Sequence, residues 1–150
     1  MSKVLVGIDC GVKTGVAMSI NGKIELLKTM GIVHAMEFVE FECRVQVGVK
    51  IYIEDARKRT WIPKEKNLKA RIGRAKGAGS VSRDAQIWEE FCKLHGFEYV
   101  LVAPKHNRTK LNAAQFKQLT GWHGRTNEHG RDAGMLLHKY LKNIGCKNEK

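Results

Sequence analysis

Residues 3–29, KVLVGIDCGVKTGVAMSINGKIELLKT, decide the fold of this chain. Two apolar runs, residues 3–10 and 16–20, are separated by a glycine-flanked turn, and the first run carries a carboxylate, Asp9, at its end. The dipeptide Asn21-Gly22 then introduces a third run, and it favours a two-residue hairpin because both central positions need positive φ. The pattern therefore predicts three antiparallel strands at the start of the chain.

The remainder of the chain alternates between helix-like and strand-like patterns. Apolar strand-like runs occupy residues 49–53 and 98–102. Helices are predicted over residues 34–47, from Ser80 or Ser82 to His95, over residues 112–119, and from Asn127 or Glu128 to residue 143. In the first of these, Phe38, Phe41 and Val45 are expected on one side of the helix. This order predicts an α/β fold with a five-stranded mixed sheet, its first three strands antiparallel, flanked by helices.

The length and composition favour a single folded domain over residues 1–150. No run approaches the roughly 18 apolar residues of a membrane span, so no membrane role is expected. The first residues lack the features of a secretory signal, which predicts a cytoplasmic protein. Four widely spaced cysteines, without a CxxC pair, are expected to be reduced thiols that mostly serve packing.

The formal net charge of +12 indicates a polyanionic partner, either nucleic acid or an anionic membrane surface. A basic amphipathic helix would favour the membrane. The densest positive stretch, residues 57–76, instead contains Trp61, Pro63 and Gly73 and has no sustained apolar face. Nucleic acid is therefore the favoured partner.

Two carboxylates stand where apolar strands end, although the chain has only fifteen Asp and Glu residues. If the strands that end near Asp9 and Glu54 are parallel neighbours, both side chains lie at one edge of the sheet, where open α/β sheets bind ligands. Two such carboxylates repel each other unless a cation neutralises them, and a hard divalent ion such as Mg²⁺ suits oxygen ligands. The spacing predicts a metal site.

The last predicted helix brings two further candidates, His129 and Asp132, which share one helical face. Four groups of this kind can hold two ions about 4 Å apart, one activating water and one stabilising the leaving oxygen of a phosphodiester. Each residue also has an ordinary explanation. A strand-end Asp9 is commonly a turn former, Asp132 can complement the helix dipole, and His129 can be a partnered surface group.

Five motifs, GIDCGVKTGVAM, IYIEDAR, RIGRAKGAG, FKQLTG and NEHGRDAGMLL, resemble in order those of the RuvC-type Holliday-junction resolvases, especially compact phage-like members. The resemblance covers most of the chain. It implies a ribonuclease H-like fold and a homodimer that cuts four-way DNA junctions with Mg²⁺ or Mn²⁺ in DNA recombination or repair. It also implies a bacterial, and in some cases phage-encoded, setting.

By matching motifs, the resemblance implies that Asp9, Glu54 and Asp132 are catalytic metal ligands, and that His129 stands where many members have aspartate. Lys117 resembles a family lysine near the scissile phosphate, although a solvated helix lysine reads the same way. The residues expected to bind DNA are Arg57, Lys58, Arg59, Trp61, Lys64, Lys66, Lys69, Arg71, Arg74, Lys76 and Arg125. Trp61 lies where members carry an aromatic that wedges into the junction, with a core anchor as the alternative.

The chain departs from the family in one connection. Only residues 122–127, WHGRTN, separate FKQLTG from the last helix, where members often have an additional helical stretch with a second basic residue. Arg125 or His123 is a candidate replacement for that charge. The expected function is a Mg²⁺-dependent crossover junction endodeoxyribonuclease acting on branched DNA.

Three alternatives stay open at this point. One is a ribonuclease H-like nuclease for flaps or structured RNA, because the opening motif is also similar to that of YqgF-type RNA-processing proteins. Another is a non-catalytic DNA-binding module, which explains the charge but not the acidic residues at strand ends. The third is an actin-like ATPase, which the chain length disfavours because such proteins need two lobes.

Overall fold

The structure, a computed structural model, describes residues 3–59 and 67–145. Its first three strands are β1 (Val4–Asp9), β2 (Lys13–Ile20) and β3 (Lys23–Gly31), paired antiparallel in sequence order as predicted. The turn between β2 and β3 has positive φ at both Asn21 (51°) and Gly22 (87°), as the Asn-Gly dipeptide predicts.

Strands β4 (Lys50–Glu54) and β5 (Glu98–Val102) complete a five-stranded sheet of order β3-β2-β1-β4-β5. The expected parallel pairing of β1 with β4 is confirmed, and β5 is parallel to β4. In this register Ile8 faces Ile53, so the next residues, Asp9 and Glu54, end neighbouring strands at the same edge. The α/β fold with a mixed sheet is therefore as the sequence predicts.

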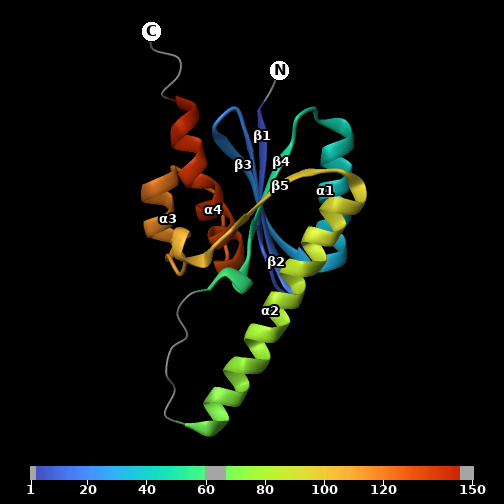
Figure 1. The fold of residues 1–150 in the computed structure, drawn as a ribbon. Coiled ribbons are helices and arrows are strands. Elements are labelled where there is room, and N and C mark those ends of the chain that lie inside the picture. Colours follow the sequence, from blue (N-terminus) through green and yellow to red (C-terminus); the bar gives the residue numbers. More distant parts are fainter. Residues whose placement is uncertain (1–2, 60–66, 146–150) are drawn as a thin grey trace.

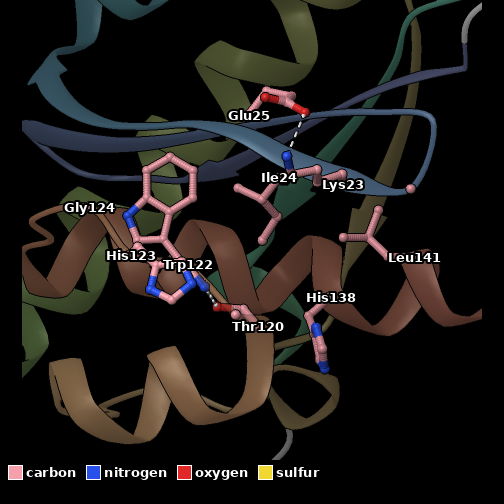
Figure 2. Close-up of a pocket in the computed structure, with 11 residues that line it drawn as sticks. Lys23, Ile24, Glu25, Thr120, Trp122, His123, Gly124, His138 and Leu141 are labelled. Atoms are coloured by element: carbon pink, nitrogen blue, oxygen red, sulfur yellow. Dashed lines mark hydrogen bonds and ion pairs between the residues drawn. The ribbon is translucent and has the colours of Figure 1, made fainter.

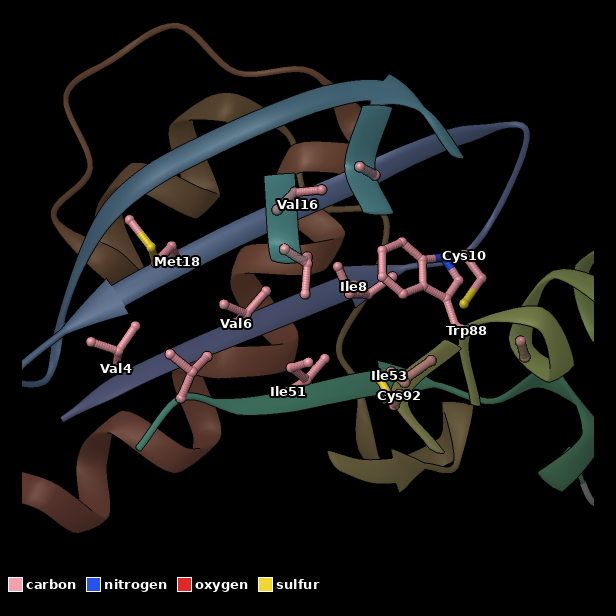
Figure 3. Packing of buried hydrophobic residues seen from close by; sticks show 14 residues of the cluster. Val4, Val6, Ile8, Cys10, Val16, Met18, Ile51, Ile53, Trp88 and Cys92 are labelled. Carbon is pink, nitrogen blue, oxygen red and sulfur yellow. The ribbon is translucent and has the colours of Figure 1, made fainter. Parts of the chain in front are cut away.

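Helices cover both faces of the sheet (Figure 1). One face carries α1 (Ile32–Val45) and α2 (Leu68–His95), and the other carries α4 (Glu128–Gly145) with α3 (Ala113–Thr120) packed beside it. Figure 3 shows the hydrophobic core between the sheet and the helices α1 and α2, in which Ile8 and Ile53 of the sheet lie near Trp88 of α2. Successive side chains of a strand point to opposite faces of the sheet, so each strand contributes apolar side chains to the hydrophobic core on either face.

Phe38, Phe41 and Val45, expected on one side of α1, are not the residues that this helix buries. Ala35 and Val39 are its buried residues, one helical turn apart, and Phe38 is half-buried. Phe41 is 61% exposed and Val45 is 56% exposed. The close contact with the sheet thus falls on a small and a β-branched side chain, and the pattern of large apolar residues pointed to a neighbouring face.

The predicted start of α2 at Ser80 or Ser82 is also wrong. The helix begins at Leu68, where the Asn67 side chain accepts a hydrogen bond from the backbone N–H of Lys69 at 2.8 Å. Its 28 residues extend about 42 Å. Residues 67–80 are all exposed, and this half projects beyond the sheet at the end where β1 and β4 finish (Figure 1). Alanine, lysine and arginine favour helix strongly enough to offset three glycines here.

The structure also bears on the predictions about membrane spans and cysteines. Within the described residues, no helix has the length and apolarity needed to cross a membrane. Cys10, Cys43 and Cys92 are free thiols, the first and last buried, as the wide spacing predicts, and Cys146 lies outside the described residues.

Candidate active site

The last helix is seated directly on the sheet beside Asp9. A β-carbon added to Gly15 would lie 2.0 Å from the backbone oxygen of His129, and one added to Gly7 would lie 2.7 Å from that of Ala133. Only glycine allows backbones to approach this closely. The helix therefore delivers the side chains of its first turns to the edge where β1 and β4 end.

Asp9 and His129 are in contact at this edge, with 3.1 Å between Asp9 Oδ2 and His129 Nδ1. Burial raises the pKa of Asp9 to about 6; the hydrogen bond from His129 opposes this rise, and the negative charges of Glu54 and Asp132 add to it. The three carboxylates are thus close enough to disfavour one another's ionisation.

Glu54 is held by Asn107, whose Nδ2 donates to Glu54 Oε2 at 2.6 Å. The same nitrogen donates to the backbone oxygen of Asp132 at 3.3 Å. Burial raises the pKa of Glu54, the Asn107 hydrogen bond opposes the rise, and the charge of Asp132 adds to it. One amide group therefore joins the end of β4 to α4.

Asp132 is buried and accepts a hydrogen bond from the backbone N–H of Lys110 at 3.1 Å. Lys110 adopts a left-handed conformation with φ of 63°, and its ammonium forms an ion pair with the exposed Glu128. Burial raises the pKa of Asp132, and the hydrogen bond and the charge of Lys110 oppose that rise. The charge of Lys110 also acts to lower the pKa of Glu54.

Asn107 and Lys110 were not among the residues selected from the sequence. Both lie in the connection after β5, which contains the short 3₁₀ turn η2 (Pro104–His106) and has no apolar periodicity. One signal was available: β5 is a further apolar run, and if it lies parallel to β4, its exit leads to the same edge. Polar residues in such a connection are candidates on position alone.

Lys117 occupies a different place from these. It is exposed on α3, and within residues 3–59 and 67–145 it makes no hydrogen bond or ion pair with the three carboxylates. The charge of Lys110 instead acts to lower the pKa values of Glu54 and Asp132, and the charge of Asp9 acts to raise the pKa of Lys110.

Two exposed cations of the basic segment after Glu54, Arg57 and Lys58, also form bonds within the fold. The Arg57 guanidinium bonds both oxygens of the buried Asp55, at 2.8 and 3.0 Å, and reaches Glu89 of α2 at 3.3 Å. Burial acts to raise the pKa of Asp55, but the hydrogen bonds and charge of Arg57 prevail and lower it. Lys58, in the 3₁₀ turn η1 (Ala56–Lys58), donates to the backbone oxygen of Leu101 at 3.2 Å.

The other predicted DNA-binding residues are likewise exposed or lie outside the described residues. Arg59 is exposed and its charge acts to lower the pKa of Glu54. Arg125 lines a hollow of about 300 Å³ with Thr126 and Asn127 at the start of α4. The exposed half of α2 carries Lys69, Arg71, Arg74 and Lys76. Trp61, Lys64 and Lys66 lie outside the described residues.

The donor set fits a hard divalent ion, because carboxylate oxygens are the ligands that Mg²⁺ and Mn²⁺ prefer. Burial is the main cause of the raised pKa values of Asp9, Glu54 and Asp132, and the charge of Asp132 adds to the rise at Asp9 and Glu54. A bound cation would favour the ionised form of each carboxylate. Within the described residues no group of three or more acidic, histidine or cysteine side chains already converges on one point as a metal site requires. An ion would therefore have to draw these side chains together.

A larger hollow, of about 610 Å³, is shown with its lining residues in Figure 2. It is formed by the start of β3, the connection after α3 and the outer part of α4, and Trp122, His123 and His138 are among its lining residues. Trp122 also packs on the core around Phe116. None of the candidate metal ligands lines this hollow. The edge of the sheet that carries Asp9, Glu54 and Asp132, here called the acidic edge, is therefore the better candidate for catalysis.

Comparison of the sequence with protein-family models and with curated proteins finds no match. Among solved structures, the fold is similar to that of T. thermophilus RuvC in complex with Holliday junction substrate, with a TM-score of 0.52 and 14% sequence identity. The similarity covers 95% of this chain and 96% of that chain. Together with the mixed five-stranded sheet and its helices, it shows that the chain has a ribonuclease H-like fold.

Proposed function

We propose that this chain is a metal-dependent endonuclease that cleaves branched DNA, with the four-way junction as its main substrate. The observation that carries the proposal is the group of three carboxylates, Asp9, Glu54 and Asp132, at one sheet edge. Burial raises the pKa of Asp9 to about 6, and the negative charges of Glu54 and Asp132 add to this rise. This acidic edge belongs to a chain with a formal charge of +12. Metal-assisted phosphodiester hydrolysis requires carboxylates that bind the metal ions. Binding of the DNA backbone requires lysine and arginine, which the rest of the chain supplies.

Asp9, Glu54 and Asp132 are the proposed ligands of Mg²⁺ or Mn²⁺, and two ions would complete the site. Bound ions of this kind activate water and stabilise the leaving oxygen. His129 orients Asp9 through Nδ1, which leaves Nε2 as a fourth donor. Each of these residues is held by the contacts of β1, β4 and α4 described above.

Lys110 is the proposed cation for the reacting phosphate, in place of Lys117. Its ammonium is exposed and paired with Glu128, while its backbone is fixed on Asp132. An approaching phosphate would compete with Glu128 for this ammonium, since surface ion pairs are weak.

The exposed half of α2 is the proposed DNA-binding arm, through Lys69, Arg71, Arg74 and Lys76. It projects from the end of the sheet that carries the carboxylates. A symmetric junction needs two cuts, so a homodimer is part of the proposal. The likeness to a RuvC structure in complex with a Holliday junction substrate supports branched DNA as the substrate.

The direct test is cleavage of labelled four-way junction, flap, linear duplex and structured RNA by the purified chain, with and without Mg²⁺ or Mn²⁺. The junction is expected to be cut fastest and only with a divalent ion. Asp9→Asn should retain junction binding and lose cleavage, whereas Glu37→Gln, an exposed acid on α1, should change neither. Normal cutting by Asp9→Asn would refute the assignment of the site. Preference for flaps or RNA would move the substrate to another branched or folded nucleic acid.

A further inference from the structure

Asn107 is placed at the acidic edge by the way the chain leaves β5. Val102, the last residue of β5, pairs with Glu54, so this connection starts beside that carboxylate. The 3₁₀ turn η2 follows, and the backbone N–H of Asn107 donates to the backbone oxygen of Pro104 at 3.0 Å. This closed turn fixes the backbone from which the Asn107 side chain reaches the site.

The side chain of Asn107 connects two elements that bear carboxylates. Its Nδ2 has two acceptors, Glu54 Oε2 at 2.6 Å and the backbone oxygen of Asp132 at 3.3 Å. The orientation of the amide follows from chemistry, because an amide oxygen in the place of Nδ2 would face a carboxylate oxygen. Both N–H groups of one nitrogen are thereby used to set the position of Glu54 relative to α4.

The oxygen of this amide, unlike its nitrogen, forms no hydrogen bond with the described residues. Asn107 Oδ1 is buried and has no hydrogen-bond partner among the described residues. Leaving a carbonyl oxygen buried and unpaired is costly, and an apolar side chain of similar size would avoid that cost. The fold alone therefore gives little reason for asparagine here, whereas the contact with Glu54 does.

We infer that Asn107 is a positioning residue for metal binding: its amide holds the Glu54 carboxylate against α4 so that it can share an ion with Asp132. The inference rests on the proposed function, because it requires that Glu54 be a ligand. Groups that orient metal ligands through hydrogen bonds in this way commonly change metal affinity by 10- to 100-fold when they are replaced.

The test compares Asn107→Leu with Asn112→Leu in Mn²⁺ titrations by calorimetry, without DNA. Asn112 is a matched control, because it is an asparagine of the same connection that caps α3 rather than contacting a carboxylate. Asn107→Leu should raise the Mn²⁺ Kd by about 10- to 100-fold and change the urea midpoint little or raise it. Asn112→Leu should lower the urea midpoint through loss of the cap and leave the Mn²⁺ Kd unchanged.

Cleavage kinetics add a second readout. In Asn107→Leu, kcat at a fixed sub-saturating Mn²⁺ concentration should fall and recover at high Mn²⁺, while the junction KM stays within about twofold. An unchanged Mn²⁺ Kd in folded Asn107→Leu overturns the inference, and Asn107→Ala takes its place if the leucine variant does not fold. Failure of the unmodified chain to bind Mn²⁺ would instead sink the proposed function, so the two failures are distinguishable.

Discussion

Replacing Asp9 by asparagine should stabilise the ion-free protein at pH 8 and change its stability far less at pH 4. The pKa of Asp9 rises from 3.8 to about 6 in the fold, mainly through burial, and its side chain is 15% exposed. A difference of about two pH units, at about 1.36 kcal/mol each, corresponds to roughly 3 kcal/mol. An acid with a raised pKa favours the folded state below pH 3.8, and this contribution is lost as the pH rises through about 6.

Asparagine has no such titration, so the gain from Asp9→Asn should grow between pH 4 and pH 7 towards roughly 3 kcal/mol. The measurement is urea unfolding followed by circular dichroism in EDTA at several pH values. Glu37→Gln is the control, because this exposed glutamate lies on α1 away from the acidic edge. Saturating Mn²⁺ should raise the stability of the unmodified protein at pH 8 and that of Asp9→Asn much less. A gain that is the same at pH 4 and pH 8 would refute the reasoning.

Two further predictions concern the placement of α4 and the choice of lysine. Gly15→Ala should lower the free energy of unfolding by about 3 kcal/mol or more, because its β-carbon would lie 2.0 Å from the His129 backbone oxygen. The control is Gly73→Ala on α2, where a β-carbon would meet open space, and it should raise the free energy of unfolding by about 0.5–1 kcal/mol. Both values are measured by urea titration. Equal effects would contradict the described contact. Lys110→Gln should lower kcat for junction cleavage by about 100-fold and Lys117→Gln by less than twofold, and the reverse order would restore Lys117 to the site.

The parts of the fold that were predictable from the sequence are those set by local rules. The hairpin at Asn21-Gly22 needs only positive φ at two residues, and the alternating apolar runs place Asp9 and Glu54 at strand ends. The face of α1 was not predictable in this way, because burial of Ala35 and Val39 depends on how closely the helix meets the sheet.

The parts of the site that sequence reasoning missed act through geometry rather than residue type. Lys110 holds Asp132 with a backbone N–H that any residue but proline has, in a left-handed conformation unusual for lysine. Asn107 reaches Glu54 from an irregular connection whose path depends on the pairing of β4 with β5. Neither contact has a periodic pattern in the sequence that would reveal it.

The seating of α4 on glycines has a consequence for how this edge can change. At Gly15 the helix meets the sheet backbone to backbone, and at Gly7 the backbone oxygen of Ala133 approaches the strand together with the Leu137 side chain. The register between α4 and the strands is therefore discrete, and sliding the helix by one residue would bring a different carbonyl onto each glycine. Side chains at this edge can be exchanged one at a time, but their spacing is inherited from the backbone, so new substrates would be accommodated in the connections and in α2 rather than by adjusting the acidic edge itself.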